Sequence, residues 1–195
     1  KLSNFYINIS NYLNPKFYFN LSLLAENYQL NNNFILAKKI LNGFNNEEEI
    51  YHWYKTKKIT QFLAEQDREE EALDYFEKKI NDFKNPSTKI LYDTANIYKR
   101  FKNYKKAVDY YSKVLSEVDK NTSTFADILY RRGGSYERMG DYERADIDLL
   151  KSIEIRPDDP YALNYLAYSW LERNYKIEEA IQMLDKAYNK KENDP

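Results

Sequence analysis

Few side chains of this 195-residue chain could carry out covalent chemistry. His52 is the only histidine, and the sequence contains no cysteine. A metal site needs several converging ligands, and an activated nucleophile needs a base beside it. Neither a Ser-His-Asp set nor a glycine-rich phosphate loop accompanies His52, and helix packing explains Gly133-Gly134 better than a nucleotide loop. We therefore expect no enzyme activity and no cofactor or metal, and we interpret His52 as a surface or interface residue.

The charged residues are numerous but balanced. The chain has 30 Lys and Arg against 31 Asp and Glu, a formal net charge of −1. Such a balance gives no long-range field that would attract nucleic acid or an anionic membrane. No apolar run approaches the roughly 20 residues that cross a bilayer. We expect no nucleic-acid partner and no direct membrane insertion within this segment.

Tyrosine is unusually abundant, with 20 Tyr and 10 Phe in the chain. Because tyrosine buries its ring and leaves its hydroxyl in water, this composition favours elongated folds with much half-buried surface. The 4 Gly and 5 Pro offer little turn chemistry for a protein of many strands. The composition therefore favours helices.

A repeat of about 35 residues organises the chain. Five segments can be laid over one another, beginning near Tyr18, Trp53, Thr88, Ala126 and Pro160. Each consists of an amphipathic stretch, a short polar break and a second amphipathic stretch, with apolar residues three and four apart. The pattern predicts five pairs of helices.

Small residues recur at the same two places of every repeat. They are Ala25, Thr60, Ala95, Gly133 and Ala167 in the first stretches, and Ala37, Ala72, Ala107, Ala145 and Ala180 in the second. A larger side chain at these places would overpack two helices that approach closely. We predict that the two helices of each repeat touch there.

These residues resemble the tetratricopeptide repeat family, whose unit is a helix-turn-helix of about 34 residues. The resemblance covers nearly the whole chain and implies an all-α fold, a right-handed superhelical solenoid of antiparallel helix pairs. Arg132 departs from the family, which usually has leucine there. The implied single domain, residues 1–195, comprises the second helix of a truncated unit (1–17) and the units 18–52, 53–87, 88–125, 126–159 and 160–195.

Both ends of the repeat region read as incomplete. Residues 1–14 look like a second helix without its partner. At the other end, Ile181, Leu184 and Tyr188 have no following helix to cover them. We expect a piece of a longer array; end-to-end self-association through these uncapped helices is an alternative that does not exclude it.

The resemblance also implies a binding surface, because the first helices of the family line a concave groove that holds extended or helical segments of partners. Tyrosine and arginine, the types enriched at binding hot spots, are frequent on this face. The protein-binding residues carried over are Tyr54, Lys57, Gln61, Lys89, Tyr92, Asn96, Arg100, Tyr130, Arg131, Arg138, Tyr161, Asn164, Tyr165 and Tyr168. Some members grip C-terminal carboxylates with a clamp of Lys, Arg and Asn. Asp93 and Asp127 stand where an amide and a cation are needed, so we predict no such clamp.

The resemblance therefore implies a non-catalytic scaffold or adaptor that binds a protein or peptide segment in its groove. The alternative is a helical-repeat RNA-binding protein of the pentatricopeptide type, which stacks helix pairs at a similar period. The balanced charge and the small-residue pattern favour the first interpretation. Residues 156–180 are similar to repeats of large bacterial tetratricopeptide proteins, some of which are lipoproteins facing the periplasm. The partner and the compartment stay open.

Overall fold

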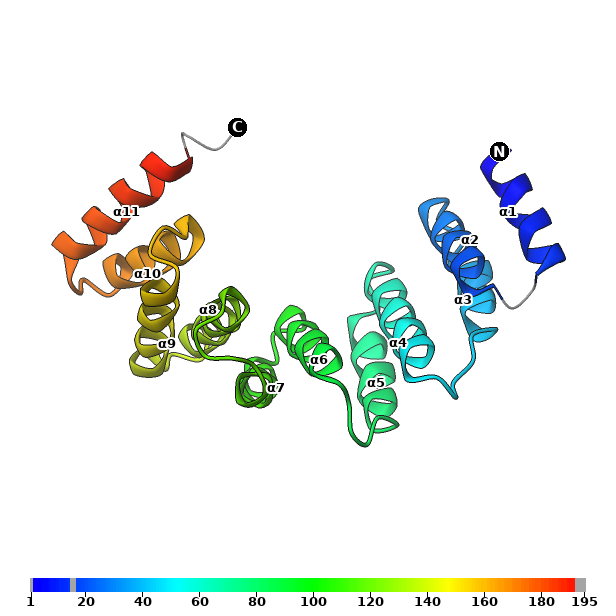
Figure 1. The fold of residues 1–195 in the computed structure, drawn as a ribbon, viewed down its shortest axis with the longest axis horizontal. Coiled ribbons are helices and arrows are strands. Elements are labelled where there is room, and N and C mark those ends of the chain that lie inside the picture. The colour runs from blue at the N-terminus through cyan, green and yellow to red at the C-terminus, as the bar shows by residue number, and fades with distance from the viewer. Residues whose placement is uncertain (1, 15–16, 192–195) are drawn as a thin grey trace. The chain divides into compact units, whose positions relative to one another are not determined.

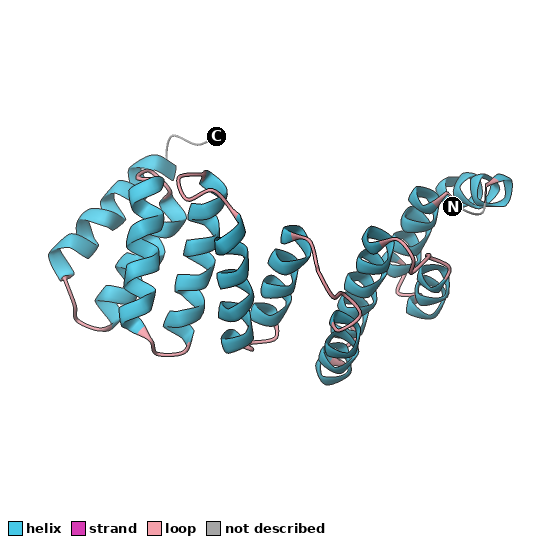
Figure 2. Ribbon diagram, turned by 60° about the horizontal axis from the view of Figure 1, so that its bottom comes forward, coloured by secondary structure: helices cyan, strands magenta, loops and turns pink. Residues whose placement is uncertain are grey.

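The structure is a computed structural model that describes residues 2–14 and 17–191 (Figure 1). Within these residues it contains eleven α-helices and no strand (Figure 2). The helices are α1 (Leu2–Leu13), α2 (Tyr18–Leu30), α3 (Phe34–Asn42), α4 (Glu49–Ala64), α5 (Glu69–Ile80), α6 (Thr88–Arg100), α7 (Tyr104–Glu117), α8 (Ser123–Arg138), α9 (Tyr142–Ile155), α10 (Pro160–Glu172) and α11 (Ile177–Lys191). The predicted all-α fold is confirmed.

The chain forms two compact units, Lys1–Asn85 with α1 to α5 and Pro86–Pro195 with α6 to α11. In the first unit α2 packs on α3, and α4 packs on α5. In the second unit the pairs are α6 with α7, α8 with α9, and α10 with α11. These are the antiparallel helix pairs that the repeat predicts. The joining of all repeats into one domain stays a prediction, and its residues 1, 15–16 and 192–195 lie outside the described part.

The small residues of the repeat lie at the contacts between paired helices. Ala25, Ala95 and Ala167 have no exposed surface, and Thr60 is 3% exposed. The alanines of the second helices are equally buried, namely Ala37, Ala72, Ala107, Ala145 and Ala180. Their burial agrees with the expectation that close backbone approach requires small side chains.

Helices α8 and α9 approach most tightly at Gly133. A Cβ atom added there would lie 2.9 Å from Leu149 Cγ, 3.2 Å from the carbonyl oxygen of Ala145 and 3.2 Å from Asp148 Cβ. The carbonyl belongs to the backbone of α9 and cannot move away on its own. Glycine is therefore required at this contact.

The break inside each repeat has a common backbone feature. The break that follows each first helix contains a residue with positive φ, namely Asn32, Asp67, Lys102, Gly140 and Asn174, and the fifth break contains a second one, Lys176. In three repeats the next residue caps the second helix, because the side chains of Asn33, Asn103 and Asp141 each accept a backbone N–H. The left-handed residue and the cap together redirect the chain into the second helix.

Arg132, which replaces a usual leucine, forms a buried polar contact between helices. Its Nε donates to Asp148 Oδ2 at 2.7 Å and its Nη2 to Asp148 Oδ1 at 2.8 Å. Its Nη1 donates to the hydroxyl of Ser112 on α7 at 3.0 Å. The two-pronged geometry is the strong form of an arginine–carboxylate pair. Arg132 thus links α7, α8 and α9 at the position where the family usually has leucine.

Apolar side chains are exposed on α1 and α11. Tyr12 and Leu13 of α1 are 85% and 76% exposed, and Ile181 and Tyr188 of α11 are 49% and 67% exposed. End-to-end association through these helices stays a prediction. Among the described residues no helix combines the length and the apolar character needed to cross a bilayer.

The contact at Gly133 can be tested by adding one methyl group. Alanine in place of glycine normally stabilises a helix by roughly 1 kcal/mol. Overpacking costs roughly 1–3 kcal/mol, so we expect Gly133→Ala to lower the free energy of unfolding by up to about 2 kcal/mol. Urea unfolding followed by circular dichroism would measure the change.

The neighbouring Gly134→Ala is the matched control for this experiment. A Cβ there would meet only the hydroxyl end of the Tyr165 side chain, at 3.3 Å, which can shift. We expect little or no destabilisation. Equal effects of the two substitutions would contradict the assigned contact.

Candidate protein-binding surface

Three of the proposed contact residues, Tyr54, Lys57 and Gln61, lie on α4 in the first unit and are half-buried. The hydroxyl of Tyr54 donates to Glu26 Oε1 at 3.4 Å, and the ammonium of Lys58 lies 2.7 Å from the same atom. Burial, and then the charge of Glu26, raise the pKa of Tyr54 to about 12. Tyr54 therefore donates as a neutral phenol and helps to join α2 to α4.

In the second unit, the remaining residues all lie on the first helices α6, α8 and α10. Cavities of about 520, 870 and 280 Å³ follow one another along these helices. Asp127 and Arg156 line both the first and the second cavity, and Pro160 and Tyr161 line both the second and the third. The hollows therefore join into a continuous surface.

We call this surface the tyrosine strip. Seven of the proposed contact residues line it, namely Lys89, Tyr92, Tyr130, Arg131, Tyr161, Asn164 and Tyr168. Four others, Asn96, Arg100, Arg138 and Tyr165, lie on the same helices but do not line these cavities. Of the fourteen residues that the family resemblance predicts on first helices, half thus line the strip.

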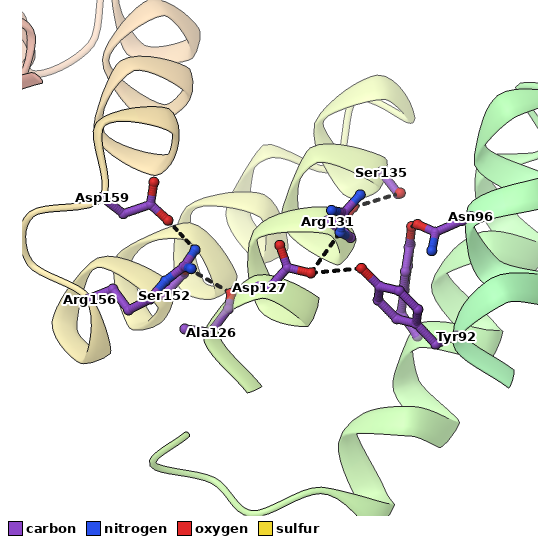
Figure 3. A network of polar contacts seen from close by, with 10 residues as sticks. Tyr92, Asn96, Ala126, Asp127, Arg131, Ser135, Ser152, Arg156 and Asp159 are labelled. Carbon is purple, nitrogen blue, oxygen red and sulfur yellow. Dashed lines mark hydrogen bonds and ion pairs between the residues drawn. The ribbon is translucent and has the colours of Figure 1, made fainter. Parts of the chain in front are cut away.

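A polar network fixes the start of the strip (Figure 3). The hydroxyl of Tyr92 on α6 donates to Asp127 Oδ2 on α8 at 2.8 Å, and Arg131 Nε donates to the same oxygen at 2.8 Å. The guanidinium carbon of Arg131 lies 5.6 Å from the centre of the Tyr92 ring. Since each member contacts the other two, their side chains hold one another in place.

The carboxylate of Asp127 stays ionised in this setting. Burial by itself would raise the pKa of Asp127, but the hydrogen bonds from Arg131 and Tyr92 outweigh it and lower the pKa below its usual value. The negative charge of Asp127 is therefore already paired with groups of the protein itself.

A second part of the network fixes the corner between α9 and α10 (Figure 3). Arg156 pairs with Asp159. Asp159 also caps α10, because its Oδ1 accepts the N–H of Tyr161 at 3.0 Å. Next to it, the hydroxyl of Ser152 donates to the carbonyl oxygen of Ala126 at 2.8 Å and joins α9 to α8.

Tyr165 and Asn96 contribute mainly to packing. The hydroxyl of Tyr165 donates to Glu137 Oε2 at 2.9 Å, and its ring meets Tyr130 edge-on at 5.8 Å between centroids. The amide oxygen of Asn96 accepts from the buried Tyr111 at 2.7 Å. Both side chains therefore bond to other parts of the protein and do not line the cavities of the strip.

Sequence reasoning missed Lys99 and the segment 156–159, which also line the strip. Lys99 is in the last turn of α6, between Asn96 and Arg100, which the family pattern marks. Arg156 to Asp159 lie at the end of the fourth repeat, after α9, where the helical period does not indicate which way a side chain points. The cluster of charged residues in Arg156-Pro157-Asp158-Asp159 was the available signal.

His52 is buried, which differs from the expected surface or interface position. Its Nε2 lies 3.4 Å from Asp82 Oδ2, and its ring lies 4.7 Å from that of Phe83. Burial lowers the pKa of His52, partly opposed by the charge of Asp82. Among the residues that the structure describes, no three His, Cys, Asp or Glu side chains cluster as metal ligands would.

The family model for tetratricopeptide repeats matches residues 88–117 and 126–159, which hold α6 to α9. The chain contains tetratricopeptide repeats. The matched repeats carry Gly133, the Arg132–Asp148 pair and the network around Asp127. Repeats of this family generally serve as non-catalytic scaffolds for protein interactions.

Several solved structures share the fold at low sequence identity. BtubC from P. vanneervenii is 16% identical with a TM-score of 0.75, over 97% of this chain and 87% of that chain. MamA from Desulfovibrio magneticus RS-1 is 13% identical with a TM-score of 0.68, over 90% and 96%. The Cut9-Hcn1 hetero-tetramer of the APC/C is 15% identical with a TM-score of 0.64, over 98% of this chain and 36% of that chain. At these identities the likeness shows the fold of the repeats alone.

The network between the third and fourth repeats can be tested through the pKa of Asp127. Tyr92→Phe removes one donor from Asp127 Oδ2, so we expect the pKa of Asp127 to rise toward its usual value of 3.8. A pH titration of the side-chain carboxyl carbon by NMR would measure it. Tyr130→Phe is the control, since the Tyr130 hydroxyl has no hydrogen bond within the described residues, and it should leave this pKa unchanged.

The same substitution has a defined effect on stability. Because folding lowers the pKa of Asp127, its contribution to stability is present above the unfolded pKa and is lost as pH falls through the folded pKa. The Tyr92→Phe variant should therefore lose less stability than the unsubstituted protein when both are acidified. Parallel acid unfolding of the two would contradict the assigned hydrogen bond.

Proposed function

We propose that the second unit binds an extended segment of a partner protein along the tyrosine strip, and that the chain acts as a non-catalytic scaffold or adaptor. The observation that supports this most is the succession of three cavities that share lining residues along α6, α8 and α10. A connected row of hollows suits several consecutive side chains of one segment. A site for a small substrate would instead be a single enclosed pocket.

The side chains of the strip support contact with a polypeptide. Tyr161 and Tyr168 are 64% and 54% exposed, so each presents a large ring that a partner could cover. Tyrosine offers much contact area with little loss of side-chain freedom. The networked Tyr92 and Arg131 add rigid polar contacts beside them. This combination of side chains held by hydrogen bonds and exposed aromatic rings is typical of protein-binding surfaces.

One relative supports a protein partner in a general way. The Cut9-Hcn1 structure is a hetero-tetramer, so a chain with this fold is assembled with a second protein there. Carrying this over to the present chain is part of the proposal. Tyr54, Lys57 and Gln61 of the first unit, and Asn96, Arg100, Arg138 and Tyr165 of the second, remain proposed contacts outside the strip.

The proposal can be tested with a random peptide library displayed on phage and selected against the full chain. We expect peptides to be enriched, and Tyr161→Ala combined with Tyr168→Ala to weaken their binding by at least about ten-fold, as for hot-spot tyrosines. Fluorescence anisotropy with labelled synthetic peptides would measure the dissociation constants.

Tyr142→Ala is the matched control, because Tyr142 is also an exposed tyrosine but lies on a second helix, α9. Its substitution should leave peptide binding unchanged. If the double variant remains folded and binds the peptides as tightly as the unsubstituted chain, the strip is not the binding surface.

We expect no binding to RNA, the function of the alternative class. Binding dominated by phosphate contacts needs an excess of cations, whereas Asp127, Asp158 and Asp159 interrupt the cations of the strip. A gel-shift titration with poly(U) at low salt should show no complex. A complex that weakens steeply with added salt would instead favour the pentatricopeptide-like alternative.

A further inference from the structure

Charged side chains line the middle cavity of the tyrosine strip, which has a volume of about 870 Å³, and they are not all paired with one another. Three carboxylates line it, and each already has a cation: Asp127 pairs with Arg131, and Asp159 with Arg156. Asp158 lies 3.3 Å from Lys186 and 2.8 Å from Lys190, both of α11. No carboxylate of the wall is left over for a further cation.

Lys99, in the last turn of α6, is that further cation. Its ammonium has no hydrogen-bond or ion-pair partner anywhere in the described part of the chain, although the side chain lines the cavity and is half-buried. Burial, and then the positive charge of Arg131, lower the pKa of Lys99; Asp127 opposes this and Arg138 adds to it. The protein thus keeps a partly desolvated cation beside two others. An anion in the cavity would stabilise the charged form of Lys99.

Further hydrogen-bond donors around the same cavity are unused. Arg131 donates to Asp127 through Nε only, so its two terminal nitrogens have no partner among the described residues. The hydroxyl of Tyr130 is likewise without a hydrogen bond there, and Tyr130 also lines the cavity. An anion would therefore meet a lysine ammonium, a guanidinium edge and a phenol in one place.

Building on the proposed function, we infer that this cavity receives one Asp or Glu side chain of the bound segment, with Lys99 as its ion-pair partner. The charge count favours a carboxylate over a phosphate. The lining has three cations and three carboxylates, but Asp158 pairs with lysines of α11 outside the lining. Lys99 is therefore left without a paired carboxylate among the described residues, and a single negative charge would pair with it. A phosphoryl group brings about 1.5 to 2 negative charges, and the surplus would face Asp127 and Asp159. Pro157, Pro160 and Tyr161 provide an apolar wall for the neighbouring residues of the segment.

This site differs from the carboxylate clamp that the sequence argues against. That clamp requires an amide and a cation where this chain has Asp93 and Asp127, and it holds a chain terminus. Here the cation is Lys99, which was not among the positions compared with the clamp. The carboxylate belongs to a side chain within the segment, because the strip continues on both sides of the cavity.

The test uses the peptides enriched from the phage library against the full chain. We expect them to share an Asp or Glu among aromatic and apolar residues. The tightest peptide is synthesised with Glu, Gln or phosphoserine at that position. On the unsubstituted chain the Glu form should bind at least about ten-fold more tightly than the Gln form. It should also bind more tightly than the phosphoserine form.

The coupling to Lys99 is measured with Lys99→Met, which keeps an unbranched apolar stem, and circular dichroism verifies its fold. In this variant the Glu and Gln peptides should bind about equally, the signature of a direct pair in a double-mutant cycle. Lys89→Met is the matched control: Lys89 is an exposed lysine on the same helix that lines the neighbouring cavity. It should leave the preference for Glu intact.

The outcomes separate this inference from the function on which it rests. Peptides that bind the strip without any acidic preference, or a Glu preference that survives in Lys99→Met, would overturn the inference and leave the proposed function standing. Tighter binding of the phosphoserine form would overturn the choice of carboxylate. Failure to enrich any peptide would count against the proposed function itself.

Discussion

The structure depends on how closely two helices of one repeat can approach. The buried alanines of the second helices and Gly133 of α8 remove side-chain volume where the backbones meet, and the paired helices pack as rigid bodies. Because the second helix covers one side of the first, the opposite side of the first helix is left to face the solvent or a partner. The tyrosine strip follows α6, α8 and α10, and it also borders the second helices at Val114 of α7 and at Leu184, Ala187 and Tyr188 of α11.

Polar contacts between repeats add what the small residues cannot supply. Close approach sets the distance within a pair, but it does not fix how one pair is rotated against the next. In the second unit the hydrogen bond from Tyr92 to Asp127 does this between the third and fourth repeats, while the hydrogen bond from Ser152 to Ala126 joins the two helices of the fourth. Arg132 reaches Ser112 on α7 as well as Asp148 on α9. Such fully paired charges restrict the alternative packings of neighbouring helices.

The helices, their pairing and the small-residue contacts could be predicted from sequence because they follow from a period. A period places Ala145 and Ala180 at equivalent points whatever their neighbours are. The ion pairs could not be predicted, because Arg132 meets Asp148 across a helix contact whose stagger the period does not specify. For the same reason the first-helix pattern selected Tyr165, which is partly buried and bonds to Glu137, as readily as Tyr161, which is 64% exposed. It passed over Lys99, whose environment depends on Arg131 of the next repeat.

The side chains of the strip differ in how far the fold has already fixed them, and this bears on recognition. Tyr92 and Arg131 are held by Asp127, so a partner that contacts them gains specificity without ordering them first. Tyr161 and Tyr168 have exposed rings that can adjust to different side chains. Lys99 stands between these two groups: the fold has partly desolvated it, and among the described residues no carboxylate forms an ion pair with it. We therefore propose that this surface recognises one charge at a fixed place and accepts varied side chains around it.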